Sequence, residues 1–340
     1  MSIAGTPLAG RPRTASKAPH RSVDNRNLLG TNACKTESVL ERRTRKIRFK
    51  QRPEARARNC RDPKRKEEAR PAMYSCINGA TTMPYTLEQD LEAAAKAGFD
   101  AVEIWSRKLD AYLESHDTAE LKALLDAYGL RAASLCPYGL VGFSDNREQL
   151  HAIERAAEVA AAIDCPVLLV CADSPPDGMG RDEAYDIMAA TVNAYAERAA
   201  AHGVKIAIEP LGQHPFIPGP REALEVIERA GHDSLGLMVD FFHYYKSGVP
   251  LEDIRTIPTE LLLIVHVDDC EDLPPADLTD QHRVYMGEGV LPLKDMMGVL
   301  REKGYAGALS VEIFREEYWE KDPMEISAAA KAAYDRMMAG

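Results

Sequence analysis

An eightfold alternation of apolar runs and helical patterns begins at Met73 and continues to the end of the chain. Near-continuous apolar runs indicate strands buried on both faces, which is typical of parallel sheets covered by helices. Eight such units occupy 268 residues (340 minus 72), close to the roughly 250 residues of a (β/α)8 TIM barrel. We therefore predict this α/β fold for residues 73–340. The apolar runs are YSCING (74–79), AVEIW (101–105), LRAASL (130–135), PVLLVC (166–171), VKIAIE (204–209), LGLMVD (235–240), LLIVHV (262–267) and ALSVEI (308–313).

The helical patterns between these runs carry their own start and stop signals. Residues 86–99 open with Thr86, a candidate N-cap, and stop at Gly98, and the segments 117–130 and 181–203 also end at glycines. A doubly wound open sheet is the alternative. It usually has fewer strands, however, and no GxGxxG motif follows the first run.

The first 72 residues differ in charge from the rest of the chain. They carry 20 Lys and Arg against 7 Asp and Glu, a balance of +13, whereas the remainder has 22 basic and 46 acidic residues, a balance of −24. Because this segment has no apolar periodicity, we predict a disordered extension over residues 1–72. It is compatible with a nucleic-acid arm, with an organelle transit peptide, or with a non-functional extension upstream of an initiator at Met73.

The cysteine pattern and the hydropathy of the chain are used to predict its cellular compartment. The seven cysteines form no CxxC pair, and a chain of this size needs no disulfide framework, which favours a reducing compartment. No window approaches the ~20 apolar residues of a membrane span. We therefore expect a soluble, cytoplasmic protein with no membrane partner. The sequence leaves the oligomeric state open, a homo-oligomer included.

Polar side chains stand at or near the ends of the last four strands. They are Glu209, Asp240, His266 and Glu312. Each alone has an ordinary explanation: a turn residue, a helix cap, a core histidine, or a carboxylate paired with an arginine. In a (β/α)8 barrel, however, these strand ends meet at one mouth, where three carboxylates repel one another unless a cation lies between them. A divalent metal would leave a net charge of about −1, and this donor set suits Mn²⁺, Mg²⁺, Co²⁺ or Zn²⁺.

The C-terminal part of the chain resembles a known family. An Asp-rich loop follows His266, and the segments HRVYMGEG (282–289) and SVEIFREEYW (310–319) come after it. With the four strand-end residues, these features resemble the xylose-isomerase-like barrel superfamily of sugar isomerases and epimerases. Within that superfamily they are most similar to the inosose (2-keto-myo-inositol) isomerases of inositol catabolism. The resemblance covers most of residues 73–340.

The resemblance implies a role for each matching residue. It implies that the four strand-end residues bind a divalent metal and that Glu209 and Glu312 also form the proton-transfer pair. It further implies that His243 and Arg283 contact substrate oxygens. One departure concerns Phe241 in FFHYYKSG, where relatives often have threonine; we expect it to make that part of the pocket less polar.

The residues suit the chemistry of such an enzyme. Moving a carbonyl along a polyol, or inverting a centre next to it, requires removal of a proton α to a ketone. A metal can stabilise the resulting enediolate, and carboxylates can take and return the proton. Arg283 can hold negative charge on oxygen and His243 can donate to a hydroxyl. We therefore expect a small polyol or sugar as substrate.

Three other functions remain open. A dehydratase of a cyclic ketone such as 3-dehydroshikimate shares the enolate step. An apurinic endonuclease would use the Asp280-x-His282 pair, but it needs further histidines after the second and third strands, which read EIWSRK and SLCPYG. The barrel's charge of −24 also opposes a phosphate backbone, so we expect no nucleic acid. A metal-free binding barrel is the third alternative.

Several further residues have a functional and a structural interpretation. Trp105 is a candidate substrate-binding residue in the pocket wall and Phe216 is a second, although aromatic residues near strand ends often serve packing. Asp268 either orients His266 or a bound water, or is a loop residue. Arg283 near Asp280 could also be a surface cation.

The glycines of the GEG motif, Gly287 and Gly289, follow the seventh strand, where barrels often bind phosphate. They lack an accompanying lysine and indicate a tight turn. We therefore expect an unphosphorylated substrate.

A chain shortened to begin at Met73 should fold and retain activity, because residues 1–72 have no apolar pattern that could pack on the barrel. Thermal melting by circular dichroism and turnover of the shortened and full-length chains would test this. Unfolding or loss of turnover would place the extension inside the domain.

Overall fold

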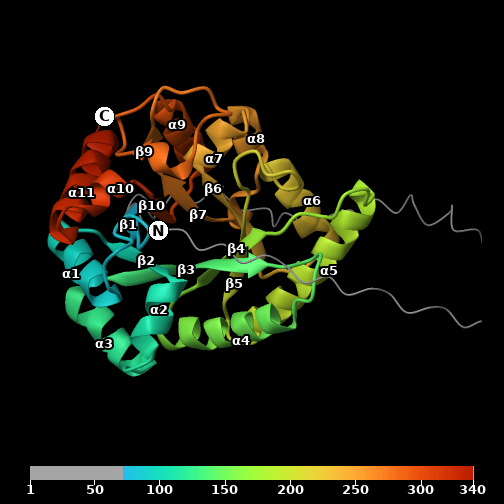
Figure 1. Ribbon diagram of the computed structural model, residues 1–340, viewed down its shortest axis with the longest axis horizontal. Helices are drawn as coiled ribbons and strands as arrows, with labels where there is room; N and C mark the ends of the chain where they lie inside the picture. Colours follow the sequence, from blue (N-terminus) through green and yellow to red (C-terminus); the bar gives the residue numbers. More distant parts are fainter. Residues whose placement is uncertain (1–71, 340) are drawn as a thin grey trace, which may run out of the picture. The chain divides into compact units, whose positions relative to one another are not determined.

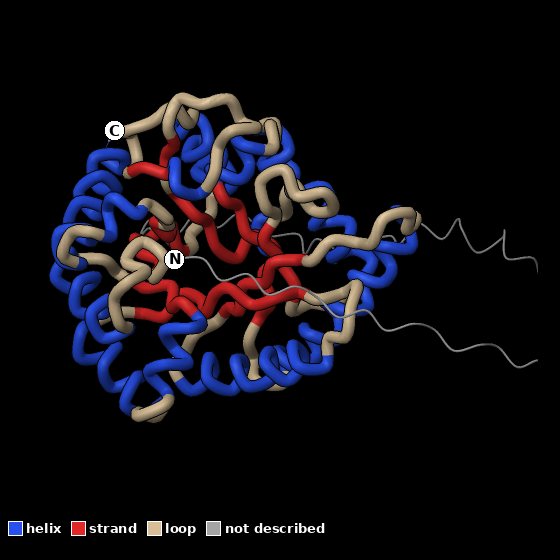
Figure 2. The backbone as a smooth tube through the Cα atoms, viewed as in Figure 1, coloured by secondary structure: helices blue, strands red, loops and turns tan. Residues whose placement is uncertain are grey.

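The computed structural model describes residues 72–339, so the predicted extension, apart from Ala72, lies outside the described part of the chain. Eight parallel strands close into a barrel (Figure 1), and the helices surround it (Figure 2). The predicted (β/α)8 fold is therefore confirmed. The barrel strands are β1 (Tyr74–Asn78), β2 (Ala101–Trp105), β3 (Arg131–Leu140), β4 (Val167–Ala172), β5 (Lys205–Glu209), β6 (Leu235–Asp240), β7 (Leu262–Val267) and β10 (Ala308–Val311).

The helices follow the predicted pattern, with short additional helices after β2, β6 and β10. Thr86 caps the first helix in a capping box with Gln89, and Gly98 ends it at φ 85°, as predicted. The helix predicted over 181–203 ends three residues early, and Gly203 lies in the following turn at φ 76°. The helices are α1 (Leu87–Ala97), α2 (Ser106–Leu113), α3 (Thr118–Tyr128), α4 (Arg147–Ala162), α5 (Arg181–Ala200), α6 (Pro220–Ala230), α7 (Phe241–Lys246), α8 (Leu251–Thr256), α9 (Leu293–Lys303), α10 (Glu316–Trp319) and α11 (Pro323–Ala339).

Side chains along the strands alternate between two apolar clusters. In β6, Leu237 and Val239 belong to the large cluster shared with the helices, whereas Met238 belongs to a smaller inner cluster. The inner cluster consists largely of small side chains. It comprises Cys76, Ala101, Ala133, Cys136, Leu169, Met238, Ile264 and Ala308. Buried polar residues share the strands with it, among them Glu103 and His266.

The loop after β7 contains a two-stranded antiparallel pair that the sequence did not predict. Its strands are β8 (Asp269–Cys270) and β9 (Arg283–Val284). The Asp269 carboxylate accepts the backbone N–H groups of Cys270, Gly287 and Leu291. Gly287 has φ +82°, and a Cβ on Gly289 would lie 2.1 Å from the carbonyl oxygen of Cys270. Both glycines therefore serve a tight turn, which supports the structural interpretation of the GEG motif.

Among residues 72–339, no helix combines the length and the apolar character that crossing a membrane requires.

Candidate metal centre

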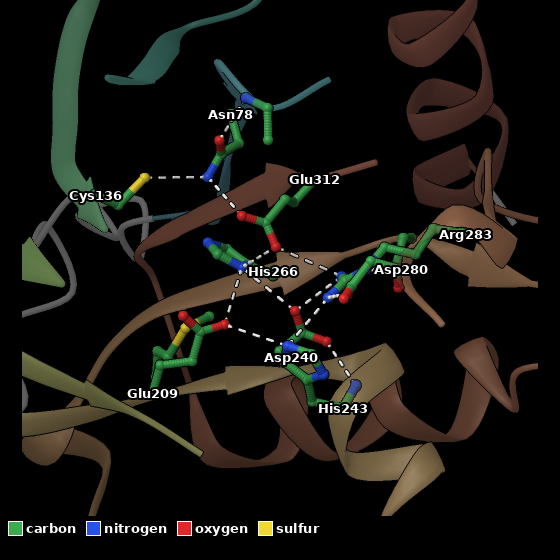
Figure 3. A network of polar contacts seen from close by, with 12 residues as sticks. Asn78, Cys136, Glu209, Asp240, His243, His266, Asp280, Arg283 and Glu312 are labelled. Atoms are coloured by element: carbon green, nitrogen blue, oxygen red, sulfur yellow. Dashed lines mark hydrogen bonds and ion pairs between the residues drawn. The ribbon is translucent and has the colours of Figure 1, made fainter. Parts of the chain in front are cut away.

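The structure brings together the four polar side chains that the sequence placed at one end of the barrel (Figure 3). Glu209 and Asp240 are the last residues of β5 and β6, His266 is the penultimate residue of β7, and Glu312 directly follows β10. These strands are neighbours in the barrel. One ligand atom from each residue lies within 4.8 Å of the others, and all four side chains are buried. Consecutive parallel strands thus supply three carboxylates and one imidazole to a single position.

The contacts of the His266 ring indicate which kind of group would be stable between the four side chains. Its Nε2 lies 2.8 Å from Glu103 Oε2, and its Nδ1 faces Glu312 Oε2 at 3.0 Å and Asp240 Oδ2 at 3.4 Å. Nδ1 is buried and has no hydrogen-bond partner among the described residues. With the proton on Nε2, the Nδ1 lone pair points at carboxylate oxygens, an arrangement that a cation between them would stabilise. The donor set therefore fits a divalent metal.

The local electrostatics agree with a requirement for positive charge. Burial alone would lower the pKa of His266, but Glu103 and Glu312 raise it well above its ordinary value. Burial raises the pKa of Glu209 to about 8, and the negative charges of Glu312 and Asp240 add to this effect. The two glutamates, whose pKa values are both raised, are thus poorly compensated by protein groups alone, and a bound cation would favour their ionised forms.

Glu103 is a site residue that the sequence analysis missed. It lies on β2, is 1% exposed, and accepts a hydrogen bond from the Ser134 hydroxyl as well as facing His266. Although burial opposes ionisation, the charge and hydrogen bond of His266 lower the pKa of Glu103 to about 2. An ionised carboxylate therefore orients the imidazole. The available signal was a glutamate in the middle of the apolar run AVEIW.

Arg283 is fully buried beside the cluster and is no surface cation. Its Nη1 donates to Asp240 Oδ2 at 2.9 Å and to Asp268 Oδ2 at 2.6 Å, and its Nη2 donates to Asp280 Oδ1 at 3.0 Å. Burial would lower the pKa of Arg283, but these carboxylates raise it well above its ordinary value. Asp268 therefore contacts the arginine, and Glu103, not Asp268, is the partner of the His266 Nε2. Orientation of a bound water by Asp268 stays a prediction. Contact between Arg283 and substrate stays a prediction.

His243 lies at the start of α7, with its ring next to Arg283. Its backbone N–H donates to Asp240 Oδ1 at 2.8 Å. Nε2 lies 3.2 Å from Arg283 Nη2, and because a guanidinium only donates, Nε2 accepts and Nδ1 carries the proton. Burial lowers the pKa of His243 to about 4, so the ring is neutral at pH 7. The Nδ1–H group is buried and has no hydrogen-bond partner among the described residues.

A cleft of about 370 Å³ opens beside these residues. Glu209, Glu312, His243 and Trp105 line it, and Trp105 packs edge-on against Phe314 with ring centroids 5.7 Å apart. A larger cavity of about 640 Å³ shares Trp105 with the cleft but contains none of the four clustered residues.

Two other aromatic residues lie outside this cleft. Phe216 packs against Phe143 and Tyr185, so its role is packing. Phe241 is fully buried in the large apolar cluster and does not line the cleft. The expectation that Phe241 changes the polarity of the pocket is therefore wrong.

The Asp280-x-His282 pair makes local contacts. Asp280 binds Arg283, and His282 Nδ1 accepts the backbone N–H of Thr279. Among residues 72–339, the group of three or more metal-ligating side chains is the one formed by Glu209, Asp240, His266 and Glu312. Neither member of the pair belongs to that group.

Comparison with known proteins identifies the family. Residues 91–336 match the Xylose isomerase-like TIM barrel family. The chain belongs to this family. An inosose isomerase of Halalkalibacterium halodurans is 32% identical over 269 residues, which cover 76% of this chain and 94% of that protein. A 3-dehydroshikimate dehydratase of Pseudomonas aeruginosa is 28% identical over 238 residues, covering 68% of this chain and 37% of that protein.

A solved structure connects this family member to metal binding. The crystal structure of the IolI protein with a bound zinc atom superposes with a TM-score of 0.73 at 28% identity, covering 78% of this chain and 98% of that one. The zinc in that relative and the buried Glu-Asp-His-Glu cluster agree with the prediction of a divalent metal. The relatives support an isomerase.

Glu103→Gln should lower the affinity for Zn²⁺ by about 10- to 100-fold, because the charge that orients the ligand imidazole is removed. Calorimetric titration of Zn²⁺ into metal-free protein would measure this. Glu154→Gln, on the outer helix α4, is the matched control. Equal affinity in both variants would contradict the orienting role of Glu103.

His243→Ala should leave Zn²⁺ content near one ion per chain while turnover falls, because His243 lies outside the four-residue cluster but lines the cleft. Elemental analysis and kinetics would test this. Loss of stoichiometric metal would identify His243 as a ligand and revive the endonuclease alternative.

Proposed function

We propose that this protein is a divalent-metal-dependent isomerase or epimerase of a cyclic polyol ketone or ketose, of the inosose isomerase type. The observation that carries the proposal is that Glu209 and Glu312 belong to the metal-ligating cluster and also line the cleft. The inosose isomerase relatives, matched over nearly their whole length, support this reaction class. As part of the proposal, we place the enzyme in cytoplasmic carbohydrate metabolism, with inositol breakdown as the expected pathway.

The four clustered residues would hold the metal, and their own chemistry defines the reaction. A divalent cation bound there would polarise the substrate carbonyl and acidify the neighbouring C–H. Glu209 or Glu312 takes the proton from the carbon next to the carbonyl, which leaves an enediolate. To move the carbonyl, a proton returns to the former carbonyl carbon, and the hydroxyl proton of the neighbouring carbon passes to the former carbonyl oxygen. To epimerise, the proton returns to the same carbon from the other face. The number of protons is unchanged in either case.

Other residues in the cleft, and Arg283 buried beside it, would bind and orient the ring. The Nδ1–H of His243 can donate to a substrate hydroxyl. Arg283 keeps Asp240 ionised and adds positive charge beside the position where oxygen becomes negative. Trp105 offers an apolar face at the cleft wall. These assignments make the expected substrate a small hydroxylated ring or chain.

A metal-dependent dehydratase is the second candidate, favoured by the 3-dehydroshikimate dehydratase relatives. Its first step is the same proton removal, but the enolate then expels a hydroxyl group. The Pseudomonas aeruginosa relative is matched over 37% of its length, against 94% for the Halalkalibacterium halodurans inosose isomerase. We therefore place the isomerase first.

A substrate screen would decide between the two reactions. Cyclic and open-chain ketoses, with 3-dehydroshikimate among them, are incubated with Mn²⁺- or Zn²⁺-loaded protein in deuterium oxide and followed by NMR. The isomerase predicts a product of unchanged mass apart from deuterium at the α carbon. Loss of water from 3-dehydroshikimate without any isomerisation would replace the first proposal with the second.

Glu209→Gln and Glu312→Gln should each reduce turnover at saturating Mn²⁺ by about 10²- to 10⁴-fold, because glutamine keeps one coordinating oxygen but cannot carry the proton. Both should still bind metal, though more weakly, since three ligands remain. Turnover and deuterium incorporation would be measured with Glu154→Gln as control. Near-normal turnover in either variant would leave that residue as a ligand only.

A further inference from the structure

Asn78 holds the outer oxygen of Glu312. It is the last residue of β1 and is fully buried. Its Oδ1 accepts the backbone N–H of Ala80 at 2.8 Å, which fixes the orientation of the amide. Its Nδ2 therefore points to Glu312 Oε1 at 3.0 Å and to Cys136 Sγ at 3.3 Å (Figure 3). Contacts on both sides of the amide thus fix its orientation.

Cys171 has the corresponding position beside Glu209. It lies near the end of β4, in register with Glu209 of β5, and it lines the cleft. Its Sγ is 3.2 Å from Glu209 Oε2, with the thiol as donor and the carboxylate as acceptor. Neither Asn78 nor Cys171 was predicted as a site residue. Both residues carry a polar group near the end of an apolar run, Asn78 in YSCING and Cys171 in PVLLVC.

The two glutamates use opposite oxygens for these contacts and for the cluster. Glu312 presents Oε2 to His266 Nδ1 at 3.0 Å while Oε1 is held by Asn78. Glu209 presents Oε1 to the same nitrogen at 3.8 Å while Oε2 is held by Cys171. In each carboxylate, one oxygen faces the inside of the cluster and the other is anchored outside it.

We propose that Asn78 and Cys171 are positioning residues that make Glu312 and Glu209 one-oxygen ligands of the metal. The inference rests on the proposed function for its catalytic consequence. An amide N–H is a stronger hydrogen-bond donor than a thiol, so Asn78 holds Glu312 more tightly than Cys171 holds Glu209. Glu312 is the fixed ligand, and Glu209 is the carboxylate that turns toward the substrate and removes its proton.

Metal affinity tests the positioning without any substrate. Zn²⁺ is titrated calorimetrically into metal-free protein. Asn78→Ala should weaken binding by about 10- to 100-fold, whereas Cys171→Ala should weaken it by less than about tenfold because the lost donor is weaker. Cys171→Ser retains a donor and should restore affinity to within about twofold of the wild type.

The matched control for this titration is Cys136→Ala. It removes a second contact of Asn78 but leaves both carboxylate oxygens with their donors, so metal affinity should stay unchanged. Equal effects of Cys136→Ala and Asn78→Ala would show general loosening of the barrel mouth and overturn the proposal. If Asn78→Ala fails to fold, the contrast between Cys171→Ala and Cys171→Ser decides, and equal affinities in that pair overturn it.

A crystal structure of the Zn²⁺-loaded protein and isotope exchange complete the test. The structure should show each glutamate bound through one oxygen, and two-oxygen coordination by Glu312 would overturn the proposal. With a turned-over substrate, Glu209→Gln should abolish deuterium incorporation while Glu312→Gln retains part of it; the reverse would overturn the assignment of Glu209. Absence of turnover in the wild type, with metal affinities as expected, would instead reject the proposed function alone.

Discussion

Buried negative charge at the barrel mouth is the constraint on which the other features depend. Asp240 is fully buried, and although burial opposes its ionisation, Arg283 and the two neighbouring histidines hold its pKa below the ordinary range. Glu209 and Glu312 lie in the same cluster, and burial raises the pKa of both. An uncompensated buried ion costs several kcal/mol. The single guanidinium of Arg283 is shared among Asp240, Asp268 and the rest of the cluster, so it does not neutralise the buried negative charge. A divalent cation would supply the missing positive charge.

The loop after β7 supplies that guanidinium to the barrel mouth. Arg283 opens β9, whose pairing with β8 and the turn held by the Asp269 carboxylate give it a rigid backbone. Its guanidinium also lies over the Phe242 ring, with Cζ 4.5 Å from the centroid, so the side chain is packed as well as paired. A lysine could not replace it, since Asp240, Asp268 and Asp280 are reached by separate N–H groups of one planar fork.

The sequence predicted those parts of the site that follow from chain order. In a closed parallel barrel, strand-end residues converge whatever the details of packing, so Glu209, Asp240, His266 and Glu312 could be placed together from their positions in eight apolar runs. The sequence did not predict contacts across the barrel. Glu103 contacts His266, which is 163 residues away in the chain, and Asn78 contacts Glu312, which is 234 residues away. Such pairs depend on register and on the direction of individual side chains, which periodicity does not specify. The β8–β9 pair was missed because two-residue strands have no periodic pattern.

We infer the location of the proposed substrate from the chemistry of the lining residues and not from cavity size. The cavity of about 640 Å³ offers more room, but the cleft of about 370 Å³ alone of the two is lined by Glu209 and Glu312. Ligand sites of roughly 300–1,000 Å³ are ordinary for small molecules, so the smaller cleft is large enough. A proton can be transferred only between groups within hydrogen-bond reach, so the proposed reaction requires the reacting carbon to lie beside these two carboxylates. Because Trp105 lines both spaces, the proposed site leaves a substrate longer than one sugar ring room to extend past this side chain into the larger cavity.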